Sequence, residues 1–107
     1  MVNKVNGLLG ICAKAGKVLS GTDVVLEGIT KKKVNLVIVA TDSSEKTIKN
    51  IKYFCDKENV EMIIYGNIFD NSKAIGKRNR AIIGICDINL ADAIKKEIHG
   101  GVEFGEN

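Results

Sequence analysis

Two lysines and a glycine–threonine pair near the start of the chain have the types and spacing of an anion-binding site. Lys14 and Lys17 precede Gly21-Thr22, where a short strand is expected to lead into a helix. The first N–H groups of a helix have no partner within it, and the helix dipole places partial positive charge there. Lysines beside such a helix start favour phosphate binding. The segment therefore predicts a site for an anion.

A second basic cluster consists of Lys73, Lys77, Arg78 and Arg80, with no acidic residue among them. Residues 1–80 contain fourteen Lys and Arg against eight Asp and Glu, whereas residues 81–107 contain two against five. The net charge is only +3, but the positive charge is confined to the part of the chain that holds both clusters. This distribution favours a surface for a polyanion, and RNA is the first hypothesis.

Residue types that support catalysis or metal binding are sparse. The only histidine, His99, falls where the last predicted helix is expected to fray, and no nucleophile motif or phosphate-binding glycine motif is present. Cys12, Cys55 and Cys86 match no metal-ligand or disulfide spacing and are expected to be buried free thiols. The sequence therefore predicts no enzyme, no cofactor and no metal site.

The length and composition favour one soluble domain. The chain has 107 residues, of which 45% are hydrophobic and 27% charged. It shows neither a secretory leader nor an apolar run of membrane-spanning length. We expect a single RNA-binding domain over residues 1–107, with about 99–107 as a frayed tail. We also expect a monomer in the cytoplasm, away from membranes.

Apolar spacing predicts alternating helices and strands that would hold the two clusters. The expected order is a helix with Val5, Leu9 and Cys12 on one face, an edge strand over 17–20, a helix from Thr22, a buried strand over 35–40, a helix opened by an Asp42–Glu45 capping box, a strand over 61–65, a short helix over about 71–76, a buried strand over 81–86 and a helix capped by Asp87. This order predicts an α/β fold. The expected architecture is a three-layer α/β/α sandwich with a small four-stranded sheet, mostly parallel or mixed.

Three motifs in this order resemble the kink-turn RNA-binding ribosomal protein family. They are Lys14-x-Gly16-Lys17-x-x-x-Gly21-Thr22, Ala40-x-Asp42 after a buried strand, and Ala74-Ile75-Gly76-Lys77 before the last apolar strand. The family includes archaeal ribosomal protein seven-Ae and eukaryotic ribosomal protein thirty of the large subunit. The likeness is greatest to its small bacterial branch, the YlxQ-type proteins, and covers roughly residues 3–98.

The resemblance implies a structured-RNA partner and a role near the ribosome or in translation. It places RNA contacts in two adjacent loops, one around Gly21-Thr22 and one from Lys77 to Arg80. The candidate RNA-binding residues are Lys14, Lys17, Gly21, Thr22, Asp23, Val24, Glu27, Lys77, Arg78, Asn79 and Arg80.

This sequence departs from the family pattern at three of those positions. Asp23, Val24 and Glu27 stand where kink-turn binders carry Asn, Glu and Lys. The changes remove a donor, an acceptor and a positive charge from base recognition, where each lost contact costs about 1–3 kcal/mol. Asn71-Ser72 also replaces Leu-Gly before the short helix, a change expected to affect packing. The resemblance therefore supports RNA binding more strongly than kink-turn recognition.

Each cluster also has a structural explanation. Gly21-Thr22 is compatible with plain turn and N-cap chemistry, and Lys77–Arg80 with a solvated loop. The alternative function is a protein-interaction module of the same fold that has lost specific RNA contacts, because an apolar residue beside two acids also suits a protein partner.

Overall fold

The computed structural model describes residues 3–103, in which helices and strands alternate. The helices are α1 (Lys4–Lys14), α2 (Thr22–Thr30), α3 (Glu45–Glu58), α4 (Ile68–Ala74) and α5 (Ile88–Glu103), and the strands are β1 (Val18–Ser20), β2 (Leu36–Val39), β3 (Glu61–Ile64) and β4 (Ile82–Ile85). Among the helices in this part of the chain, none combines the length and apolar character needed to cross a membrane.

The four strands form one mixed sheet in the order β1-β4-β2-β3. β2 and β3 are parallel and joined by α3, whereas β4 lies between β1 and β2 and is antiparallel to both. The sheet was predicted to be mostly parallel or mixed. It is mixed, and it is not mostly parallel. The seven residues of α4 span only about 10 Å. The chain therefore turns back at the edge where β3 ends, and β4 runs in the opposite direction.

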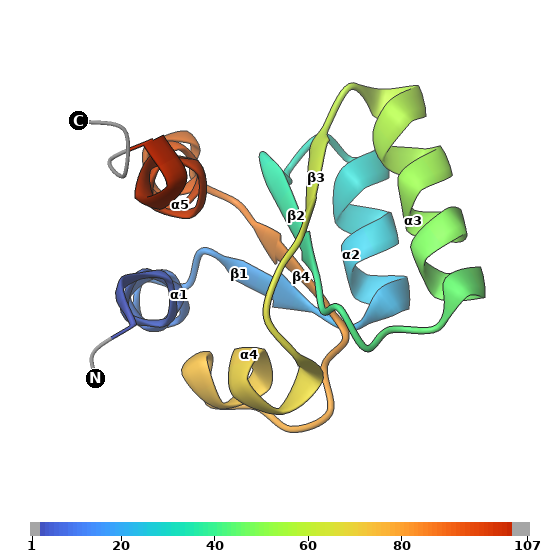
Figure 1. The fold of residues 1–107 in the computed structure, drawn as a ribbon. Coiled ribbons are helices and arrows are strands. Elements are labelled where there is room, and N and C mark those ends of the chain that lie inside the picture. Colours follow the sequence, from blue (N-terminus) through green and yellow to red (C-terminus); the bar gives the residue numbers. More distant parts are fainter. Residues whose placement is uncertain (1–2, 104–107) are drawn as a thin grey trace.

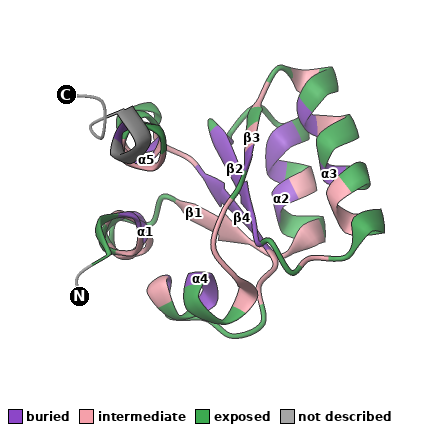
Figure 2. Cartoon of the chain, in the orientation of Figure 1, coloured by how far each residue is buried: buried purple, intermediate pink, exposed green. Residues whose placement is uncertain are grey.

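Helices cover both faces of the sheet, which confirms the predicted three-layer sandwich. α1, α4 and α5 lie on one face, and α2 and α3 lie on the other (Figure 1). The central strands β2 and β4 are buried throughout (Figure 2). Because strand side chains alternate, Leu36 and Ile38 join the core under α1, α4 and α5, while Val37 and Val39 join the core under α2 and α3.

The start of α3 differs from the predicted capping box. Its N-cap is Ser44, whose hydroxyl accepts from the N–H of Thr47 at 3.1 Å. Asp42 does not cap α3. Its carboxylate accepts from the N–H of Ile68 at 2.9 Å and holds the start of α4. The prediction was wrong because both residue types cap helices, and Ser44 is the one immediately before the first helical turn.

The last two helices are longer at one end than predicted. α4 begins at Ile68 rather than near residue 71, because Asn67 caps it by accepting from the N–H of Asp70 at 2.7 Å. Asp87 accepts from the N–H of Leu90 at 2.9 Å, which confirms the predicted cap of α5. α5 continues to Glu103, and residues 104–107 lie outside the described residues, so the frayed tail expected over about 99–107 stays a prediction.

The cysteines are free thiols in or beside the core. Cys12 and Cys55 are buried, as predicted, while Cys86 is half-buried. Burial, together with a smaller contribution from the neighbouring carboxylates Asp87 and Asp56 respectively, raises the pKa of Cys12 and of Cys55 to about 11. Both buried thiols are therefore protonated at neutral pH and serve as small apolar core residues.

Candidate nucleic-acid interface

The glycine turn (residues 20–24) connects β1 to α2 with a backbone conformation that favours glycine. Gly21 has a φ of +97°, and its N–H donates to the carbonyl oxygen of Ile82 at 2.9 Å. Because Gly21 has no side chain, α2 receives no side-chain cap. The other helices in residues 3–103 are capped by Asn3, Ser44, Asn67 and Asp87. Within this part of the chain, α2 is thus the helix whose N-terminal donors are left for a ligand.

The basic loop (residues 76–80) connects α4 to β4 and is anchored by Ser72. This serine is 2% exposed. Its hydroxyl accepts from the N–H of Arg80 at 2.7 Å and donates to the carbonyl oxygen of Arg80 at 3.2 Å. The N–H of Lys77 donates to the carbonyl oxygen of Ser72 at 2.9 Å. Asn79 adopts a left-handed φ of 55°, which turns the chain. Ser72 therefore holds the basic loop against α4.

Arg80 joins the basic loop to the glycine turn. Its Nε donates to the hydroxyl oxygen of Ser20 at 3.1 Å, and its Nη1 donates to the carbonyl oxygen of Arg78 at 3.2 Å. The side chain is half-buried, whereas Lys77 and Arg78 are exposed. Arg80 is therefore a positioning residue as well as a cation, a role that the basic cluster in the sequence did not reveal.

The same edge of the sheet holds three helix N-termini. Ser20 pairs with Ile83, and Val39 pairs with both Ile82 and Ile64, so β1, β2 and β3 end where β4 begins. The helices that follow these three strands, α2, α3 and α4, therefore begin at this edge (Figure 1). Each helix start carries roughly half a positive charge. Acidic residues in the first turns of these helices, Asp23, Glu45 and Asp70, offset this charge, so the basic loop supplies the exposed cations beside the glycine turn.

Lys14 and Lys17 do not join the glycine turn in one cluster. Lys17 lies at the other end of β1, where its carbonyl oxygen accepts from the N–H of Cys86 at 2.8 Å. At about 3.3 Å per strand residue, it is some 13 Å from Gly21 along the backbone. Lys14 ends α1, before the turn that leads to Lys17. The structure therefore brings the glycine turn together with residues 77–80, and leaves these two lysines apart from it.

The outer face of α2 is apolar and acidic. Val24 is 48% exposed, and Asp23 is exposed beside it. Glu27, one turn further on, pairs with Lys31 at 3.6 Å, and both side chains are well exposed. Such a surface pair contributes about 0–1 kcal/mol. Thr22 is half-buried at the helix start. The three family departures therefore lie on the exposed surface of α2 and are not absorbed into the core.

Sequence reasoning underestimated two polar residues that shape this edge. Asn71 is 1% exposed, and its Nδ2 donates to the carbonyl oxygen of Tyr65 at 2.8 Å, which fixes the turn at Gly66. Ser72 beside it anchors the basic loop. The detectable signal was a polar pair where the family carries Leu-Gly. The hydroxyl of Ser72 and the Nδ2 of Asn71 have hydrogen-bond partners, whereas the Oδ1 of Asn71 is buried without one among the described residues.

Two relatives and two solved structures are similar to this chain over most of its length. RNA-binding protein YlxQ of Enterococcus faecium is 32% identical over 100 residues, which cover 91% of this chain and 93% of that protein. RNA-binding protein YlxQ of Bacillus subtilis (strain 168) is 30% identical over 90 residues, which cover 81% of this chain and 87% of that protein.

The structural similarity extends to more distant proteins. A protein with unknown function from Bacillus halodurans C matches with a TM-score of 0.87 at 29% identity, covering 90% of this chain and 97% of that one. The 15.5kD RNA binding protein of Giardia lamblia matches with a TM-score of 0.75 at 18% identity, covering 96% and 91%, and it supports the fold alone.

The family assignment rests on the sequence as a whole. The model of the ribosomal protein L7Ae/L30e/S12e/Gadd45 family matches residues 3–96, which include the glycine turn and the basic loop. Both curated relatives carry the name YlxQ, which confirms the bacterial branch predicted from the three motifs. The chain belongs to the ribosomal protein L7Ae/L30e/S12e/Gadd45 family.

Proposed function

We propose that this protein binds structured RNA, and is not an enzyme, through the glycine turn and the basic loop. The observation that carries the proposal is the hydrogen bond from Arg80 to Ser20, which links the uncapped start of α2 to the exposed cations Lys77 and Arg78. Membership in a ribosomal protein family and relatives named RNA-binding proteins support it.

Two kinds of contact follow from the chemistry of this surface. The N–H groups at the start of α2 meet a phosphate or a base edge in a fixed direction, and Lys77, Arg78 and the remaining donors of Arg80 bind phosphates. Asp23, Val24 and Glu27 weaken base-specific recognition, because they offer neither an amide donor nor a cation. Affinity therefore depends steeply on salt.

The test is a titration with two RNAs of equal length, a standard kink-turn and a version whose sheared G·A pairs are converted to Watson–Crick pairs. Salt-sensitive binding of either RNA supports the proposal. A preference for the kink-turn means that kink-turn recognition tolerates Asp23, Val24 and Glu27, whereas equal binding indicates general recognition of structured RNA. Binding of neither RNA at low salt contradicts the two-loop contact with these RNAs.

The cellular setting that we propose is the ribosome or another structured non-coding RNA in the cytoplasm, with the protein acting as a monomer. Co-sedimentation with ribosomal subunits at low and high salt tests the first part. The alternative, a protein-interaction module, predicts partners that survive nuclease treatment of a lysate. The names of the curated relatives favour RNA over this alternative.

A further inference from the structure

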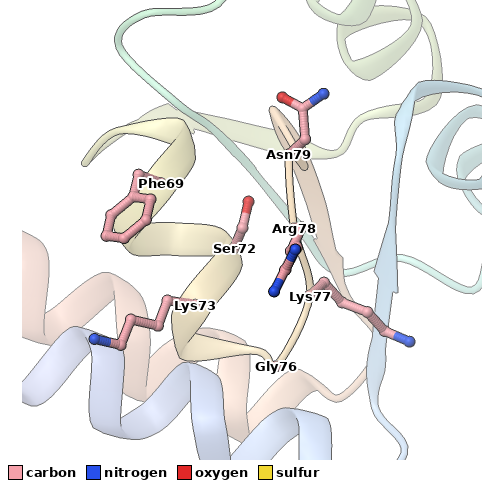
Figure 3. A pocket seen from close by; sticks show the side chains of 7 residues that line it. All are labelled: Phe69, Ser72, Lys73, Gly76, Lys77, Arg78 and Asn79. Carbon is pink, nitrogen blue, oxygen red and sulfur yellow. The ribbon is translucent and has the colours of Figure 1, made fainter.

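Two lysines that are close to the glycine turn in sequence lie at the opposite end of the sheet. Lys17 precedes β1, whereas Gly21 follows it. Figure 3 shows Lys77 and Arg78 on the basic loop, which precedes β4. Because β1 and β4 are antiparallel, Lys17 lies beside the end of β4 and not beside its start. The two-loop contact that we propose therefore leaves Lys14 and Lys17 without a role.

A third lysine joins them at this end of the sheet. The N–H of Cys86 donates to the carbonyl oxygen of Lys17 at 2.8 Å, and the N–H of Asn35 donates to the carbonyl oxygen of Ile85 at 2.8 Å. These bonds hold the start of β1 and the connection into β2 on either side of the end of β4. Burial raises the pKa of the Cys86 thiol, and the charges of Lys17 and Lys33 oppose this effect. Both ammonium groups therefore lie near the same thiol.

The turn between α1 and β1 presents two of these lysines. Lys14 is the last residue of α1, and Gly16, with a φ of +71°, turns the chain toward β1. The N–H of Lys17 donates to the carbonyl oxygen of Cys12 at 2.9 Å, which keeps the turn tight. Ala15 and Gly16 are exposed between the two lysines and have no bulky side chain to keep a ligand away. The lysine patch consists of Lys14, Lys17 and Lys33, all of them exposed.

Acidic residues at this end of the sheet have partners of their own. Asp87 caps α5. Glu27 pairs with Lys31, and Glu58 pairs with Lys32. Among the described residues, the three lysines of the patch make no ion pair. The lysine patch therefore offers a concentration of uncompensated positive charge, and its complementary ligand is a polyanion.

We propose that the lysine patch binds the backbone of a second RNA segment, so that one protein molecule joins two segments of a folded RNA. α1 and α2 end at this edge, where helix termini carry partial negative charge, so the lysine side chains rather than backbone donors hold the phosphates. Lysine is depleted in protein interfaces and common at phosphate contacts, which favours RNA over an acidic protein. This inference rests on the proposed RNA-binding function and adds a second contact at the other end of the sheet.

The test counts how many RNA molecules one protein molecule binds. The standard kink-turn RNA is added in excess at low salt, and analytical ultracentrifugation gives the mass of the complex. We expect wild-type protein to bind two RNA molecules, and the patch variant, Lys14→Gln with Lys17→Gln and Lys33→Gln, to bind one. A complex of the wild-type protein with a single RNA that the patch variant binds equally well contradicts the proposal.

The patch variant also predicts a change in affinity. The second binding step should weaken on the order of 100-fold, and its slope of log K against log salt should become shallower by about 2–3, because each phosphate contact contributes about 0.7–0.9. Because the three lysines are exposed, the variant should keep the wild-type melting temperature.

A control variant with the same loss of charge separates a local site from net charge. It carries Lys49→Gln, Lys57→Gln and Lys96→Gln, at exposed positions on α3 and α5 that make no ion pair among the described residues. Equal losses for the control and the patch variant contradict the proposal. Polyglutamate that displaces the second RNA at a lower charge concentration than RNA itself overturns the proposal in favour of an acidic protein partner.

The two RNA proposals fail separately. The comparison variant is Lys77→Ala with Arg78→Ala, which removes exposed cations of the basic loop. RNA binding that is lost in this variant and unchanged in the patch variant refutes the lysine patch and leaves the two-loop contact standing. RNA binding that is lost in the patch variant and unchanged in the basic-loop variant supports the lysine patch and refutes the two-loop contact.

Discussion

The glycine turn and the basic loop meet at one hydrogen bond, yet they offer a ligand different groups. The glycine turn has fixed backbone donors but acidic and apolar side chains, notably Asp23 and Val24. The basic loop has exposed cations, Lys77 and Arg78, on flexible stems. In the RNA contact that we propose, the glycine turn would set the position of the RNA and the basic loop would supply affinity. Each region can be altered separately, so the division can be tested.

The largest effect is expected from removing the charge of the basic loop. A triple alanine variant of Lys77, Arg78 and Arg80 should bind structured RNA on the order of 100-fold more weakly at low salt. The slope of log K against log salt should become shallower by about 2–3, because each phosphate contact contributes about 0.7–0.9. Filter binding at several salt concentrations measures both quantities.

Arg80 also has a structural role, so a double variant is needed as a control. Lys77→Ala with Arg78→Ala keeps the hydrogen bond from Arg80 to Ser20 and should retain the wild-type melting temperature. Unchanged RNA affinity in both variants would refute the two-loop contact.

The next effect comes from the backbone of the glycine turn. Gly21→Ala forces a φ of +97° on a residue with a Cβ atom, which costs about 1–3 kcal/mol of folding free energy. The turn relaxes to avoid this strain, so the donors of α2 move and RNA affinity also falls. Urea denaturation and RNA titration measure the two losses.

Gly7→Ala is the matched control for that change. Gly7 lies within α1, and an added Cβ meets no atom within 4 Å. This variant should be neutral or more stable by about 0.5–1 kcal/mol. Equal destabilisation by both variants would contradict a special backbone requirement at Gly21.

Local patterns in the sequence were sufficient to predict the layers but not the contacts between loops. Val37 and Ile38 belong to an unbroken aliphatic run, which indicates a strand buried on both faces wherever that strand lies in the sheet. The bond from Arg80 to Ser20 joins residues 60 apart in sequence, and no local pattern encodes it. The direction of β4 was missed for a similar reason, since it depends on where the short α4 returns the chain.

The candidate site was predicted in part. Gly21 was recognisable because a glycine between an expected strand and an expected helix indicates an unusual turn. Lys17 was assigned to the same cluster because it is close in sequence, although β1 separates the two positions. Asp42 was assigned to the wrong helix, since its partner, the N–H of Ile68, is distant in sequence.

A smaller effect is expected from loosening the basic loop without changing its charge. Ser72→Ala leaves the N–H and carbonyl oxygen of Arg80 without their hydroxyl partner, which should cost about 1–3 kcal/mol of stability. RNA affinity should fall less than in the triple variant, because the cations remain. Ser43→Ala is the control, since the hydroxyl of Ser43 is buried with no partner among the described residues. Similar losses from both serines would contradict a specific anchor.

The smallest effect is expected from adding a cation to α2, about one helical turn after the glycine turn. Glu27→Lys replaces a carboxylate on the outer face of α2 with a cation, so binding of all structured RNAs should tighten by about fivefold, or about 1 kcal/mol. The salt slope should steepen by about one. Glu27→Gln separates the loss of negative charge from the gain of positive charge, and both variants are measured by RNA titration at two salt concentrations.

Asp56→Lys on α3 is the matched control for this last change. Asp56 pairs with Lys52 at 3.2 Å, also at i,i+4 spacing but with the cation first, and both this pair and that of Glu27 with Lys31 are exposed. The two substitutions therefore alter net charge equally and each removes one exposed helix pair, but Asp56 lies in the last turn of α3, whose first turn is at the edge with the glycine turn. A gain confined to Glu27→Lys means that charge acts locally beside the glycine turn. An equal gain from both variants means that net charge alone attracts the RNA. That result would refute the proposed division of roles between the glycine turn and the basic loop.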